Sequence, residues 1–188
     1  AKKSGVKIAS YVNMQGSSIS RMSDYPFQSH AGPEICVMST KVFTSQIAWG
    51  YLLAKVISGQ STAGRENLQN LAEKMEKFLK ESETHESLKE LAGKLVLAKD
   101  IFLLGKYQNL NIIKEGMIKI IEGTYIHAHG IPAGDLKHYA ITLIEKGVPV
   151  IAVISNDKTK SEVLNAVNEV RARGADVTVI TSIDEGET

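Results

Sequence analysis

The chain has 188 residues, 43% of them hydrophobic, and its 22 basic and 21 acidic side chains give a formal charge of +1. This balance excludes the basic stripe of a nucleic-acid-binding protein and the composition of a disordered chain. A single cysteine, Cys36, excludes an internal disulfide framework and a cysteine-rich zinc site. Because there is no apolar run of roughly 20 residues and no signal-peptide core at the start, we expect a cytoplasmic protein that binds neither membrane nor nucleic acid.

Hydrophobic periodicity predicts strands that alternate with helices. The β-branched run at 6–12 is typical of a buried strand, and 40–57 carries the apolar face of a helix. Residues 64–97 are rich in Glu, Lys and Leu, and they predict two amphipathic helices that break near 82–85, where Thr84 could cap the second. The remaining predicted elements are a strand at 100–104, a helix at 109–123, a strand at 148–155, a helix at 158–173 and a strand at 175–181.

This alternation predicts an α/β fold of the flavodoxin or Rossmann-like type, in which helices cover both faces of parallel sheets in three layers. The helical stretch then links two α/β units, which divides the chain into residues 1–62, 63–97 and 98–188. Ligands of such sheets usually bind at the carboxyl ends of the strands. Both ends of the sequence fall close to predicted strands, so we expect two incomplete units.

The richest chemical segment runs from Lys114 to Tyr139. Within it, Glu115, Lys119 and Glu122 are spaced i, i+4 and i+7, which places them on one helical face. A carboxylate beside an ammonium could serve as general base and proton partner on a sugar. The ordinary alternative is a solvated ion pair. The isoleucines that surround these charges make most of the helix apolar, which favours the functional interpretation.

Three histidines follow in the same segment. His127 and His129 are spaced as on one side of a strand and could hold a metal, but no third ligand stands at a characteristic distance. Packing is the favoured alternative for both, and we expect no metal site. His138 is the best candidate for a titrating imidazole, with a hydrogen bond to a helix-terminal carbonyl as the competing interpretation.

Weaker signals lie before the helix at 40–57. Ser39 could bind an oxyanion at the helix start, although N-capping alone explains a serine there more often than not. Glu34 follows a Gly-Pro turn, where solvent is its default neighbour. We expect Cys36 to be a small buried side chain, since no base stands beside it in the sequence.

Three passages together resemble one family. They are VNMQGSSISRMSD at 12–24, HAGPEICVMSTKVFTSQ at 30–46 and EGMIKIIEGTYIHAHGIPAGDLKH at 115–138. In this order, and separated by a helical linker, they are similar to the isomerase part of the glutamine:fructose-6-phosphate amidotransferases, or glucosamine-6-phosphate synthases. That part is a tandem of two sugar isomerase (SIS) domains.

The resemblance implies catalytic roles for three residues. Glu122 matches the base that moves a proton between C1 and C2 of the sugar, and Lys119 matches the lysine that assists this transfer. His138 matches the histidine that helps to open the sugar ring and reaches the active site of a partner subunit. The resemblance therefore implies a homodimer.

The resemblance also implies a substrate pocket and a reaction. Val37 and Ser39 match positions that line the sugar pocket, and Glu34 matches an acidic residue close to it. The parent enzyme would convert fructose 6-phosphate and ammonia, supplied from glutamine by a glutaminase domain, into glucosamine 6-phosphate without a cofactor. The family's phosphate loop and Schiff-base lysine would fall outside this sequence, so we expect the 188 residues alone to be inactive.

Departures from the family's pattern leave alternatives open. His129 and Asp135 stand where the family has Glu, Tyr139 stands where it has Gly, and Ile121 stands where it has Lys. A stand-alone sugar-phosphate deaminase or deglycase is one alternative. A non-catalytic SIS regulator that binds a phosphosugar is another. The sequence does not decide between amination and deamination.

Overall fold

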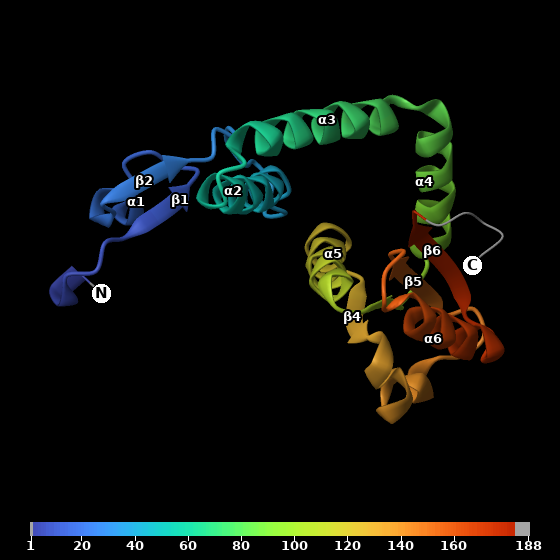
Figure 1. Cartoon of the computed structure of the whole chain (residues 1–188). Coiled ribbons are helices and arrows are strands. Elements are labelled where there is room, and N and C mark those ends of the chain that lie inside the picture. The colour runs from blue at the N-terminus through green and yellow to red at the C-terminus, as the bar shows by residue number, and fades with distance from the viewer. Residues whose placement is uncertain (1, 183–188) are drawn as a thin grey trace. The chain divides into compact units, whose positions relative to one another are not determined.

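The computed structural model describes residues 2–182 (Figure 1). The described residues up to His85 form one compact unit, and those from Glu86 onward form a second. Each unit has its own parallel sheet, of two strands in the first and four in the second. No helix in the described part of the chain combines the length and apolar character needed to cross a membrane.

The first unit begins with a small βαβ arrangement. The short 3-10 turn η1 (Lys2–Ser4) comes first. Strands β1 (Ala9–Val12) and β2 (Tyr25–Gln28) then pair in parallel, and helix α1 (Ser18–Met22) connects them. Helices α2 (Lys41–Ile57) and α3 (Ser61–Lys80) follow. Trp49 of α2 stacks on Tyr11 of β1 with ring centroids 5.0 Å apart. This aromatic contact joins the sheet to α2.

The strand predicted at 6–12 is shorter than expected and is not buried. Only residues 9–12 are in β1, and their burial is partial at best, because a two-stranded sheet leaves much of its surface uncovered. Cys36, which we expected to be buried, lies exposed in the loop before α2. All the fully buried hydrophobic residues of the described chain lie between Ile101 and Val170, in the second unit.

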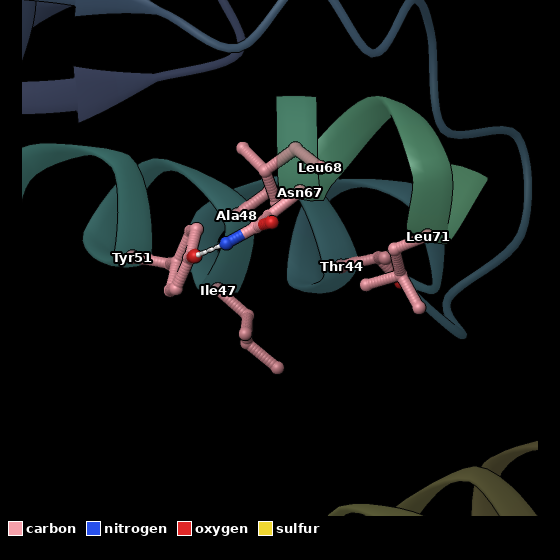
Figure 2. A pocket seen from close by; sticks show the side chains of 7 residues that line it. All are labelled: Thr44, Ile47, Ala48, Tyr51, Asn67, Leu68 and Leu71. Carbon is pink, nitrogen blue, oxygen red and sulfur yellow. Dashed lines mark hydrogen bonds between the residues drawn. The ribbon is translucent and has the colours of Figure 1, made fainter. Parts of the chain in front are cut away.

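Helices α2 and α3 approach closely at one glycine. A Cβ atom on Gly64 would lie 2.8 Å from the Cβ of Lys55, so a larger residue would push the helices apart. Beside this crossing is an open apolar hollow of about 360 Å³, across which Asn67 Nδ2 donates a hydrogen bond to Tyr51 Oη at 2.8 Å (Figure 2). Its lining residues are Thr44, Ile47, Ala48, Tyr51, Asn67, Leu68 and Leu71.

The predicted pair of amphipathic helices is confirmed as α3 and α4 (Ser82–Leu95). The chain breaks at Glu81, whose backbone is extended with φ −69° and ψ 128°. Thr84 was predicted to cap the second helix, but α4 begins at Ser82 and Thr84 lies within it. Because α4 begins directly after the extended Glu81, Thr84 falls inside its first turn and cannot be its cap.

The second unit has a four-stranded sheet in the order β4-β3-β5-β6, and all its neighbouring strands are parallel. The strands are β3 (Asp100–Gly105), β4 (His127–Pro132), β5 (Pro149–Ile154) and β6 (Asp176–Thr181). Helix α5 (Gln108–Thr124) connects β3 to β4, and α6 (Lys160–Ala172) connects β5 to β6. Between β4 and β5 the chain forms two 3-10 helices, η2 (Ala133–His138) and η3 (Ala140–Leu143).

The side chains of β3 alternate between the two faces of the sheet, and each face has its own hydrophobic core. Ile101 and Leu103 pack with Ile113 of α5 on one face of the sheet. Phe102 and Leu104 point to the other face, where they join Leu136 of η2 and the apolar side of α6. The predicted three-layer α/β/α arrangement is thus confirmed for this unit, with α5 on one face and η2, η3 and α6 on the other (Figure 1).

Candidate active site

Helix α5 carries the cluster of charges that the sequence singled out. The helix follows β3 and precedes the parallel strand β4, so it must return from the carboxyl end of the sheet to its amino end. It ends at Tyr125, whose φ of 61° is left-handed. Lys119 and Glu122, in the last two turns, therefore lie towards the amino end of the strands, away from the edge where such sheets usually bind ligands.

Lys119 lies between two carboxylates on this face. Its Nζ is 2.7 Å from Glu122 Oε2 and 3.5 Å from Glu115 Oε1. The side chains are only 21–27% exposed, so the cluster is partly withdrawn from water. The hydrogen bond that Lys119 donates to Glu122 is the main cause that raises the pKa of Lys119 above its ordinary value. The predicted face is confirmed, and it holds a cation that stays protonated next to a carboxylate.

We expect Glu122→Gln to lower the pKa of Lys119 towards its ordinary value of 10.5, because a neutral amide replaces the charged acceptor. A lysine with a raised folded pKa contributes stability that is complete below its ordinary pKa and is lost as the pH rises through the raised value. Heteronuclear NMR of the lysine ammonium groups measures this shift. Glu90→Gln in the exposed Glu90–Lys94 pair is the matched control and should leave Lys119 unchanged. An unaltered Lys119 pKa in Glu122→Gln would contradict the pairing.

His138 is not close to this cluster in the same chain. It is exposed on η2, which packs on the sheet face opposite α5. The four-stranded sheet therefore separates the His138 imidazole from the Glu122 carboxylate. One copy of the chain brings Lys119 and Glu122 together but does not add His138 to them.

The three predicted sugar-pocket residues belong to the first unit. Val37 is 71% exposed and Ser39 is partly buried in the loop before α2. Glu34, for which we expected solvent as neighbour, instead accepts the backbone N–H of Val42 at 3.0 Å. Because Thr40 makes no side-chain capping bond, Glu34 satisfies a free amide in the first turn of α2. The carboxylate thereby fixes the loop that carries Val37 and Ser39.

His127 and His129 have separate partners. His127 Nδ1 is 2.6 Å from Asp100 Oδ1, and His129 Nε2 is 3.3 Å from Tyr139 Oη. Within residues 2–182, no group of three or more His, Cys, Asp or Glu side chains is placed to hold a metal ion. Sequence reasoning missed Asp100 and Tyr139, because only the strand register places residue 100 opposite residue 127.

The chain has two parallel sheets, a three-layer second unit and a charged cluster on the helix that connects β3 to β4. These features define a class of α/β proteins, and comparison with known protein families identifies it. The SIS domain model matches residues 1–56 and 94–187, so the chain belongs to the SIS domain family. This confirms the family that the three sequence passages predicted.

Individual relatives show which members of the SIS domain family this chain is similar to. The chain is 40% identical over 174 residues to glutamine–fructose-6-phosphate aminotransferase (isomerizing) of Aquifex aeolicus, a match that covers 92% of this chain and 29% of that protein. The protein of the same name from Chlorobaculum tepidum is 37% identical over 191 residues, covering 100% of this chain and 31% of its own length. The chain thus spans about a third of the curated relatives it matches.

Solved structures agree with the described fold. The C-terminal domain of glucosamine-fructose-6-phosphate aminotransferase from Francisella tularensis is 30% identical, with a TM-score of 0.84 over 96% of this chain and 53% of that chain. A glucosamine-6-phosphate deaminase from Thermotoga maritima is 19% identical, with a TM-score of 0.72 over 95% of this chain and 52% of that chain. The second similarity shows the fold alone.

Proposed function

We propose that this chain is the isomerase part of an aminotransferase that converts fructose 6-phosphate and glutamine-derived ammonia into glucosamine 6-phosphate. The observation that carries the proposal is the pair of Lys119 and Glu122, 2.7 Å apart on α5 and partly shielded from water. The named relatives at 37–40% identity support the substrate and the direction. A glutaminase domain in the parent chain would supply the ammonia.

The pair fits the proton transfer that turns a ketose derivative into an aldose derivative. Glu122 takes a proton from C1 of the open-chain sugar, which leaves an enediol or enolamine, and returns the proton to C2. Negative charge that develops on the neighbouring oxygen is stabilised by the Lys119 ammonium. Since the hydrogen bond to Glu122 raises the pKa of Lys119, the lysine keeps its positive charge beside this carboxylate.

His138 takes part from a second copy of the chain. In one copy the sheet stands between His138 and Glu122, so the ring-opening imidazole of each site comes from the other subunit of a homodimer. The half-exposed Ile118 and Ile121 of α5 provide apolar surface near the pair for a second subunit to cover. Val37 and Ser39 bind the sugar on a loop that Glu34 holds in place.

The proposed function also divides the chain into three parts. Residues 1–62 and 98–188 belong to two successive SIS units, and residues 63–97 are the helices that link them. The family match supports this division, because it leaves out residues 57–93.

The proposal is tested with the complete polypeptide that contains this sequence, assayed with fructose 6-phosphate and either glutamine or ammonium. We expect glucosamine 6-phosphate to form with both nitrogen sources. Ammonia release from glucosamine 6-phosphate without measurable synthesis would instead establish a deaminase. Sugar-phosphate binding without turnover in either direction would establish a binding protein.

A further inference from the structure

A second hollow lies in the second unit, on the opposite side of the sheet from the α5 cluster. It has a volume of about 250 Å³ and opens at the amino end of β3 and β4, under the segment that connects η2 to β5. Seven residues line it: Asp100, Phe102, His127, His129, Tyr139, Leu143 and Val148. Because Ala128 packs towards α5, its neighbours His127 and His129 point into this hollow and away from Glu122.

The body of the hollow is apolar and its rim is polar. Phe102 is 3% exposed and forms the floor, with Leu143 and Val148 beside it. The His129 ring meets Phe102 and Tyr139 edge-on, with centroids 6.3 and 6.1 Å apart. Aromatic walls at this separation hold each other in fixed orientations. The volume suits a molecule with a single ring.

The polar groups of the rim favour a positively charged ligand. An ionised carboxylate only accepts hydrogen bonds, so the Nδ1 of His127 donates to Asp100. Asp100 keeps a second carboxylate oxygen, and Tyr139 adds a hydroxyl and a ring face. None of the seven lining residues is Lys or Arg, so Asp100 meets neither of these cations within the hollow and pairs there with the His127 imidazole.

We propose that this hollow binds a small organic ammonium ion built on one ring. The ammonium group donates a hydrogen bond to the Asp100 carboxylate oxygen that His127 leaves free, and it lies against the Tyr139 ring face. The ring of the ligand covers Phe102, Leu143 and Val148. A phosphorylated sugar is disfavoured, because its dianion would meet a carboxylate and no Lys or Arg side chain.

This site is separate from the proposed aminotransferase site in place and in chemistry. Its residues lie on the η2 side of the sheet, whereas Lys119 and Glu122 lie on α5. Binding of an ammonium ion here therefore does not depend on the proposed function, and either proposal can fail while the other holds.

The experiment titrates the whole 188-residue chain with two matched pairs of probes while NMR follows the backbone amides. Glucosamine and cyclohexylamine carry the ammonium group, and glucose and cyclohexanol are their uncharged counterparts. We expect both amines to shift the amides of the lining residues saturably, with a dissociation constant on the order of millimolar for ligands of this size. The uncharged partners should bind at least about tenfold more weakly.

Two variants localise the binding. Asp100→Asn should weaken both amines about tenfold, because it removes the charge and keeps the shape. Asp135→Asn makes the same chemical change at an exposed position of η2 outside the hollow, and it should leave affinity unchanged. The proposal is overturned if neither amine shifts the lining residues, if glucose and cyclohexanol bind as tightly as the amines, or if Asp100→Asn has no effect.

Discussion

Replacing Glu122 by Gln in the complete polypeptide is expected to reduce kcat for glucosamine 6-phosphate formation by about 10²–10⁴-fold, the usual contribution of a positioned general base. KM for fructose 6-phosphate should change little, because the amide keeps the size of the carboxylate and can still accept a hydrogen bond from Lys119. The proton that must leave C1 then has no acceptor at the right place. Steady-state kinetics with thermal unfolding as a folding control measures both quantities.

The matched control is another Glu–Lys ion pair on a helix. Glu90 and Lys94 of α4 are joined at 3.0 Å and are both exposed, so Glu90→Gln should leave kcat and KM unchanged. If Glu122→Gln kept more than about a tenth of the wild-type kcat, a fall far smaller than that caused by losing a general base, Glu122 would not be that base.

Mixing two inactive variants is expected to restore activity. In a homodimer whose sites each combine Glu122 of one subunit with His138 of the other, a Glu122→Gln subunit paired with a His138→Ala subunit contains one intact site. Random exchange of subunits should then recover about a quarter of the wild-type activity, since half of the dimers are mixed and each has one of two sites. The structural reason is that the sheet separates these two residues in a single copy.

The measurement is an activity titration after the two variants are unfolded and refolded together. Mixed dimers are detected independently by a tag on one variant. The control is each variant refolded alone, which should remain inactive. Mixed dimers that form without any gain in activity would show that each site takes His138 from its own subunit.

The second unit was predictable because its helices are long and its two central strands, β3 and β5, are buried on both faces. The strand predicted at 100–104 is β3 (Asp100–Gly105), and the helix predicted at 109–123 is α5 (Gln108–Thr124). Near-continuous apolar runs such as Ile101–Leu104 leave little ambiguity about burial. The first unit was harder, since α1 has five residues and β2 has four including Pro26, too few for a periodicity to develop.

In the candidate site, the sequence predicted only the contacts between residues that are close together along the chain. Helical spacing placed Glu115, Lys119 and Glu122 on one face, and the structure joins them as ion pairs. The Asp100–His127 contact spans 27 residues and depends on the register of two parallel strands, which no local pattern encodes. Glu34 shows the same limit, because its partner amide belongs to a helix that begins seven residues later.

In the proposed mechanism, Glu122 of α5 moves a proton between neighbouring carbons of the sugar. This transfer is tested most directly with fructose 6-phosphate deuterated at C1, by following the isotope in the glucosamine 6-phosphate that the complete polypeptide makes. We expect part of the deuterium to appear at C2 in the wild type, and we expect Glu122→Gln to form no product labelled there. Product labelled at C2 to the same extent and at the same rate in Glu122→Gln would contradict it.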